Sequence, residues 1–242
     1  MSEMFCFQCQ ETARNQGCTR VGVCGKKPEV ANAQDLLIWV TKGLGEVATK
    51  LRAEGKEVPV DSNHIVSGNL FTTITNANFD KDAIYDRVAM TIRETARLRE
   101  QLEDTEGLSE AAQYSEEDRG EWDALAEKVG VMNTEDEDIR SLRELIIYGL
   151  KGMAAYTKHA NVLGHESEEV DAFMQETLAK TMDDSLSVDD LVQLTLDTGA
   201  HGVKAMALLD GANTDTYGNP EITEVELGVR DNPGILISGH DL

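Results

Sequence analysis

All four cysteines of this 242-residue chain lie close to its N-terminus, as Cys6, Cys9, Cys18 and Cys24. Their spacing, C-x2-C-x8-C-x5-C, allows one turn-rich stretch to close on a small inorganic centre. An iron–sulfur cluster needs four thiolates in a compact loop and tolerates uneven spacing, whereas all-cysteine zinc sites commonly use C-x2-C pairs. Disulfides inside this one loop would stabilise little of the remaining chain. The spacing therefore favours an iron–sulfur cluster and leaves structural zinc open.

Three glycines, Gly17, Gly22 and Gly25, flank the third and fourth cysteines. Glycine permits a positive φ and a close approach of the backbone to a ligand. Backbone N–H groups in such a loop can donate hydrogen bonds to cluster sulfides. The glycines therefore agree with a loop that wraps around a metal centre.

The rest of the sequence predicts mainly helices. Hydrophobic residues make up 40% of the chain and aromatic residues only 5%, which indicates an aliphatic core of packed helices. Apolar residues recur at three- and four-residue intervals, which is the helical period. Helices are expected over residues 32–53, 61–76, 81–103, 121–129, 135–163, 167–182 and 187–213, with an acidic loop or linker over 104–119. This order predicts two helical bundles, of which the first has three helices.

The pattern changes after residue 216. Residues 221–229 partly alternate between apolar and polar side chains, and residues 235–237 form a short apolar run followed by Gly239 and His240. A buried parallel strand that ends in a glycine turn has this pattern. The last segment is therefore expected to be the start of a second, α/β domain whose remainder is missing.

Charge and hydropathy limit the partners and the location. The formal net charge is -23, with 45 acidic against 22 basic residues, so the chain should repel nucleic acid and anionic membranes. No run of 18 apolar residues and no signal-peptide pattern is visible, which predicts a cytoplasmic protein without a membrane span. The acidic surface is expected to be solvated; adaptation to high salt is the alternative.

Several segments, in order along the chain, resemble the hybrid cluster protein family, also called prismane proteins or hydroxylamine reductases. The first segments surround the cysteines, at residues 4–13, 17–18 and 22–26. Further similar segments are residues 70–78, 138–145, 217–223 and 232–242, and residues 104–119 are the least similar part. The resemblance therefore spans essentially the whole chain.

The resemblance implies a mainly α fold, in which residues 1–28 form a cysteine-rich iron–sulfur loop and residues 29–216 two three-helix bundles. Residues 217–242 would begin a truncated α/β, Rossmann-like domain. It also implies that Cys6, Cys9, Cys18 and Cys24 bind a [4Fe-4S] cluster. In this family a second, hybrid iron–sulfur–oxygen cluster performs the chemistry, and His240 matches its histidine ligand.

The family reduces hydroxylamine to ammonia and water and has been assigned nitric oxide reduction. The resemblance therefore implies that this chain carries an electron-relay site and no complete catalytic site. Its partners would be a small redox electron donor and the missing C-terminal α/β domains. The chain alone is expected to be inactive, and the alternative is a stand-alone, non-catalytic electron-transfer module.

Overall fold

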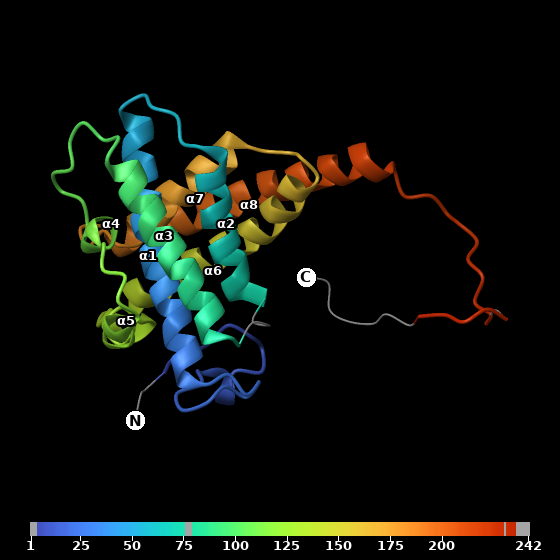
Figure 1. Ribbon diagram of the computed structural model, residues 1–242, viewed down its shortest axis with the longest axis horizontal. Helices are drawn as coiled ribbons and strands as arrows, with labels where there is room; N and C mark the ends of the chain where they lie inside the picture. Colours follow the sequence, from blue (N-terminus) through green and yellow to red (C-terminus); the bar gives the residue numbers. More distant parts are fainter. Residues whose placement is uncertain (1–3, 76–78, 230, 236–242) are drawn as a thin grey trace.

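The computed structural model describes residues 4–75, 79–229 and 231–235 (Figure 1). Within these ranges the chain is mainly helical and contains no strand beyond one isolated bridge. The helices are α1 (Pro28–Ala53), α2 (Val60–Thr75), α3 (Lys81–Arg99), α4 (Glu110–Gln113), α5 (Arg119–Ala126), α6 (Glu137–Val162), α7 (Glu168–Lys180) and α8 (Val188–Tyr217), with short 3-10 turns η1 (Ala13–Asn15) and η2 (Val131–Asn133). The predicted mainly α class is confirmed.

Helix α1 is the element on which the others assemble. Pro28 stands in its first turn, where the missing N–H costs no hydrogen bond, and four of its leucines are completely buried. A side chain at Gly43 would place Cβ 2.3 Å from the carbonyl oxygen of Ala111 in α4. One at Gly45 would place it 2.8 Å from the carbonyl oxygen of Gln175 in α7. The two glycines therefore allow α4 and α7 to contact α1 through their backbones.

The helices share one main core. Buried apolar side chains of α1, α2, α3, α6, α7 and α8 form a single cluster, and α2 packs on α6 while α7 packs on α1. Arg52 of α1 adds polar links to two other helices: its guanidinium donates to Gln175 of α7 at 2.5 Å and to Asn63 of α2 at 3.3 Å. The predicted division into two separate three-helix bundles is therefore not confirmed.

Residues 104–119, predicted to be a surface loop, contribute to the core. Helix α4 lies within them, and Ala111 and Ala112 are buried against α1. A second apolar cluster forms beside it around Trp122 of α5, which is fully buried and meets Tyr85 of α3 edge-on at 5.1 Å between ring centroids. The predicted loop or linker therefore contains a short helix, and the contact that buries its alanines comes from a distant part of the sequence.

The C-terminal segment leaves the helical body. Helix α8 continues to Tyr217, four residues past its expected end, and the chain beyond it extends away from the body (Figure 1). The described residues after Gly218 form no strand, and Ile222, Leu227 and Ile235 are almost fully exposed. The strand predicted at residues 235–237 lies largely outside the described residues, as does His240, so the α/β prediction for residues 217–242 stays a prediction.

Candidate functional site

The cysteine loop folds as a compact unit at one end of α1 (Figure 1). Its frame is an antiparallel bridge: the N–H of Cys6 donates to the carbonyl of Cys18 at 3.1 Å, and the N–H of Cys18 donates back at 2.9 Å. The bridge closes residues 6–18 into a loop that contains η1. In that turn Arg14 and Asn15 have positive φ, at 58° and 57°, an uncommon conformation for residues with side chains.

A second tight turn carries the fourth cysteine. The N–H of Gly22 donates to the carbonyl of Lys26 and the N–H of Gly25 to the carbonyl of Gly22, both at 2.8 Å. Gly25 has φ of 90°, a region that glycine adopts readily. A Cβ on Gly22 would lie 3.0 Å from the sulfur of Cys24. The glycines are therefore needed for a turn that presents Cys24 at its exposed tip.

None of the four cysteines is in a disulfide, and they differ in exposure. Cys18 is buried, Cys6 and Cys9 are half-buried, and Cys24 is exposed. The bridge pairs the first and third cysteines through their backbones. Among the residues that the structure describes, no three His, Cys, Asp or Glu side chains meet at one point as metal ligands would. By chemistry a donor set of four thiols in one segment fits an iron–sulfur cluster.

A buried lysine lies against this loop. Lys26 has no exposed surface, and its ammonium donates to Gln34 Oε1 of α1 at 2.6 Å and approaches the sulfur of Cys6 at 3.7 Å. A cation beside a sulfur stabilises negative charge on that sulfur. The loop therefore already holds a positive charge where a thiolate ligand would carry a negative one.

The loop is also anchored to α6. The hydroxyl of Tyr148 donates to the backbone carbonyl of Gln8 at 3.0 Å, and the ring of Tyr148 lies 6.5 Å from that of Phe7. An open cleft of about 880 Å³ runs along this contact and is lined by Cys9, Tyr148 and Glu144, among others. The loop is thus held by both α1 and α6.

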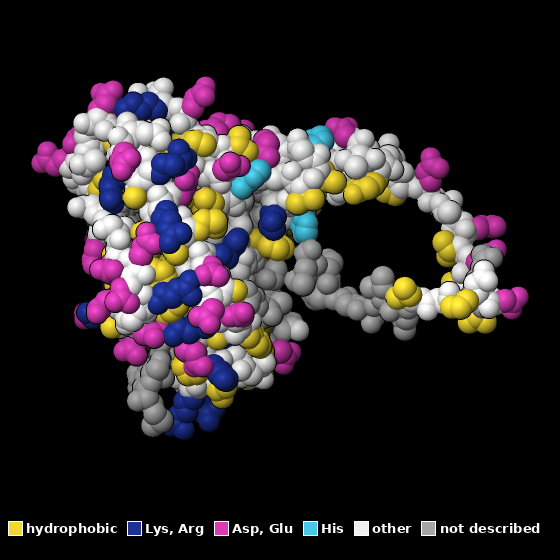
Figure 2. Space-filling view, in the orientation of Figure 1, with side chains coloured by type: hydrophobic (Ala, Val, Ile, Leu, Met, Phe, Trp, Pro, Cys, Tyr) yellow, Lys and Arg dark blue, Asp and Glu magenta, His cyan; other side chains and the backbone are white. Residues whose placement is uncertain are grey.

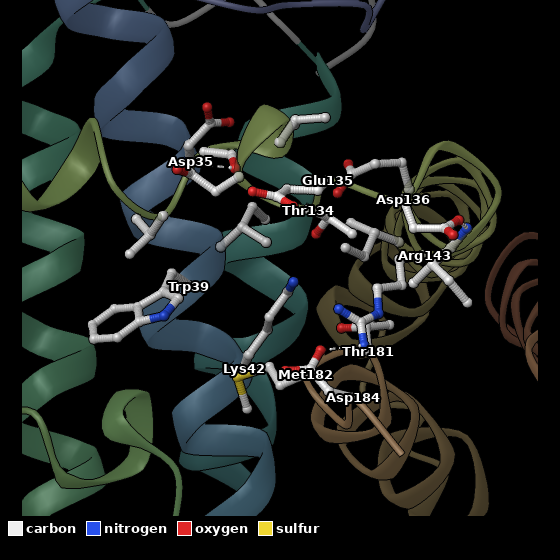
Figure 3. A pocket seen from close by; sticks show the side chains of 18 of the residues that line it. Asp35, Trp39, Lys42, Thr134, Glu135, Asp136, Arg143, Thr181, Met182 and Asp184 are labelled. Atoms are coloured by element: carbon white, nitrogen blue, oxygen red, sulfur yellow. Dashed lines mark hydrogen bonds and ion pairs between the residues drawn. The ribbon is translucent and has the colours of Figure 1, made fainter. Parts of the chain in front are cut away.

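A second, charged cleft of about 520 Å³ opens between α1 and α6 (Figure 3). Asp35 and Lys42 of α1 line one wall, Glu144 and Lys151 of α6 line the other, and Gln8 joins them from the cysteine loop. In Figure 3 the Lys42 side chain extends from α1 into the cleft. Acidic and basic side chains therefore share one partly enclosed space directly beside the cysteines.

Burial shifts the pKa values of these four groups. Burial, helped by the neighbouring Glu144, raises the pKa of Asp35 to about 7. It also raises the pKa of Glu144, against the opposing effect of Lys42 and Lys151. Burial lowers the pKa of Lys42, and it lowers that of Lys151 to about 8. The carboxyls and amines thus approach one another in pKa, which is typical of functional sites.

Sequence reasoning missed these groups, although a signal for them exists. Asp35 and Lys42 are seven residues apart on α1, and Glu144 and Lys151 are seven residues apart on α6. On a helix this spacing places both side chains on one face, two turns apart. In each helix an acid and a base therefore interrupt a largely apolar face, which is the sequence pattern of a buried charge pair.

The distribution of charged side chains and the hydropathy of the helices both bear on possible partners. On the face shown in Figure 2, Lys and Arg side chains are interspersed with Asp and Glu and form no continuous basic patch. None of the helices in the described part of the chain has both the length and the apolar character needed to cross a bilayer.

Comparison with known proteins gives a consistent family. A model described as "Prismane/CO dehydrogenase family" matches residues 4–242. A hydroxylamine reductase of Desulfovibrio desulfuricans is 64% identical over 239 residues, covering 99% of this chain and 44% of the relative. Hydroxylamine reductases of Clostridium perfringens (57%) and Clostridium acetobutylicum (55%) match over 99% of this chain and 44% and 46% of their own lengths. The chain thus spans less than half the length of these relatives.

Proposed function

Because the chain belongs to the prismane/CO dehydrogenase family, we propose that it is the iron–sulfur-binding N-terminal portion of a hydroxylamine reductase. The reaction that the relatives' name implies is NH2OH + 2e⁻ + 2H⁺ → NH3 + H2O, with nitric oxide as a possible further substrate. The observation that carries the proposal is the N-terminal segment that holds all four cysteines, in which a backbone bridge joins Cys6 and Cys18.

In this proposal the thiolates of Cys6, Cys9, Cys18 and Cys24 hold a [4Fe-4S] cluster as iron ligands. Such a cluster, when bound, accepts and passes on one electron at a time. The Cys6–Cys18 bridge holds the backbones of two ligands together, and Cys9 and Cys24 would complete the ligand set. Lys26 offsets part of the negative charge at Cys6. His240 would serve the hybrid cluster as a neutral imidazole ligand.

The exposure of the cysteines supports a role in receiving electrons. Cys24 lies at the surface, and the neighbouring Val21 and Val23 are 56% and 62% exposed. Weak electron-transfer complexes use small interfaces. We propose that a small redox protein docks at this tip and delivers single electrons, which then pass to the catalytic part of the reductase.

The test is anaerobic reconstitution of this chain with iron and sulfide. We expect about four irons and four sulfides per chain and an electron paramagnetic resonance signal on reduction. Cys18→Ser, which changes the buried ligand, should lose the signal, whereas Ser2→Ala, outside the ligand set, should keep it. A colourless protein that holds one zinc and no sulfide would refute the proposal and support the structural-zinc alternative.

A stand-alone electron-transfer module is the second candidate. It requires only the four cysteines of the N-terminal segment, Cys6, Cys9, Cys18 and Cys24. Hydroxylamine turnover by this chain alone, with reduced viologen as the donor, tests the second candidate. We expect no turnover by the isolated chain under either assignment, so measurable turnover would exclude a non-catalytic module.

A further inference from the structure

The charged cleft between α1 and α6 lies next to the cysteine loop and has room for water. It is partly open to solvent, and Gln8, which stands between Cys6 and Cys9 in the sequence, is one of the residues that line it. The side-chain oxygen of Gln8 is buried and has no hydrogen-bond partner within the described part of the chain. The volume of the cleft, about 520 Å³, is enough for several water molecules, each of which needs about 30 Å³.

The carboxylates in this cleft are electrostatically linked to the cysteine loop. Asp35 interacts with Lys26, whose ammonium lies 3.7 Å from the sulfur of Cys6. Lys151 interacts with Cys6 as well as with Asp35 and Glu144. Glu144 also lines the second cleft, together with Cys9. Both carboxyl groups are therefore linked to the cysteine loop through lysines, Asp35 through Lys26 and Lys151, and Glu144 through Lys151.

The groups around the two carboxyls come from several elements. Lys26 belongs to the loop and Lys42 to α1, Arg143 and Lys151 come from α6, and Glu135, Asp136 and Asp184 lie on the rim. Arg143 is tied to Asp184 by a 2.9 Å ion pair and to the carbonyl of Asp183, and Lys26 to Gln34. No hydrogen bond links Asp35 or Glu144 to any of these side chains in the described part of the chain.

We propose that Asp35 and Glu144 form a proton-uptake site, which takes one proton from solvent through the cleft when an electron enters the four-cysteine site. The inference rests on the proposed function. Added negative charge at the cysteines raises the pKa of a nearby carboxyl group. Because the pKa of Asp35 is already about 7, such a rise changes its protonation at neutral pH.

The step balances in electrons and atoms. A one-electron donor, dithionite in the experiment, is oxidised, and the four-cysteine site is reduced by the same electron. One O–H bond breaks in a hydronium ion and one forms on a carboxylate oxygen. The net charge of the protein is therefore unchanged by the combined uptake of an electron and a proton.

The experiment is a redox titration of the reconstituted chain between pH 6 and pH 9. Above pH 7 the carboxyl pair Asp35 and Glu144 has lost the proton when the four-cysteine site is oxidised, and it keeps the proton when that site is reduced. The potential of the wild type should therefore fall as pH rises, by up to about 59 mV per pH unit, the one-electron equivalent of a tenfold change. The double variant Asp35→Asn, Glu144→Gln should lose this slope, and Asp138→Asn, an exposed carboxylate on α6, should keep it.

A spectroscopic measurement on the wild type tests the same point without any variant. The reduced-minus-oxidised infrared spectrum should gain the C=O band of a protonated carboxylic acid. A wild-type potential that does not change with pH, a double variant that keeps the slope, or a spectrum without this band would overturn the inference. Iron and sulfide content, measured first, separates these results from failure of the proposed function, which would remove the inference as well.

Discussion

Replacing Lys26 by methionine tests whether the fold places a positive charge at the cysteine site for its redox function. Methionine keeps the length of the side chain and removes the ammonium that lies 3.7 Å from the sulfur of Cys6. A cation at this place stabilises the reduced, more negative form of the site. Lys26→Met should therefore lower the reduction potential of the reconstituted protein.

The size of the effect follows from the contact that is lost. A hydrogen bond to a charged group contributes about 1.5–3 kcal/mol. If that contribution appears only in the reduced form, it corresponds to roughly 60–130 mV for a one-electron couple, because a tenfold change equals about 59 mV. The fall in reduction potential for Lys26→Met should therefore not exceed this range. The variant also leaves Gln34 Oε1 without its donor, which should cost about 1–3 kcal/mol of stability.

The adjacent Lys27 supplies a matched control, because its side chain is 73% exposed and its nearest acid, Glu29, is 4.0 Å away. Lys27→Met removes the same formal charge from the next position in the chain. Its potential should stay close to that of the wild type, since solvent screens exposed charges. Spectroelectrochemical titration of both variants at one pH gives the comparison. Equal potentials for Lys26→Met and Lys27→Met would refute the reasoning.

Three further predictions concern the scaffold. Gly43→Ala should destabilise the fold by about 1–2 kcal/mol, because overpacking outweighs the gain in helix propensity. Gly152→Ala in α6 should stabilise the fold by up to about 1 kcal/mol, because the added Cβ meets no atom within 4 Å. Urea unfolding measures both effects. Burial raises the pKa of Asp171 to about 7, above its value in the unfolded chain, so the free energy of unfolding falls as pH rises from about 4 to 7. Asp171→Asn should remove this fall. In thermal denaturation at pH 8 the variant should therefore be more stable than the wild type. Arg52→Met should lose about 1–3 kcal/mol in urea unfolding through its links to α2 and α7, and no loss would show that these links contribute nothing.

Local signals in the sequence predicted the helices well. Ser167 and Ser187 cap α7 and α8 as expected, and the side chain of Asp190 completes a capping box with Ser187. The start of α6 was predicted two residues early, since the cap is Asp136, which accepts from the N–H groups of two residues in the first turn. Thr134 and several acidic residues compete for the cap at that point, and only the path of the chain decides among them.

Features that depend on distant contacts could not be predicted in the same way. The alanines of α4 stand in an acidic, polar stretch, and they are buried because Gly43 lets them approach α1. The predicted division into two bundles is also not confirmed, because α2 packs on α6 and α7 packs on α1, in addition to the packing of α3 on α1. Periodicity shows which face of a helix is apolar, but it carries no information on which helix will cover that face.

The cysteine site also combines a feature that the local sequence predicts with features that depend on distant contacts. Spacing identified the four cysteines as one ligand set, while the bridge between Cys6 and Cys18 and the buried Lys26 became visible only in the structure. Lys26 follows the last cysteine by two residues and resembles any surface lysine in the sequence, next to the exposed Lys27. Its burial depends on Gln34, one turn into α1, which accepts its hydrogen bond.

The charged cleft is not explained by stability. Bringing charges out of water costs several kcal/mol per ion unless excellent geometry and further hydrogen bonds compensate, and apolar replacements of buried pairs are often neutral or stabilising. Asp35 and Glu144 have opposite charges nearby but no direct hydrogen bond to them among the described side chains, so the compensation is incomplete. A group that must change its protonation needs this arrangement, since a tightly paired carboxylate would stay ionised at every physiological pH. The weak pairing that makes the cleft a poor stabilising element is therefore what a proton-uptake site requires.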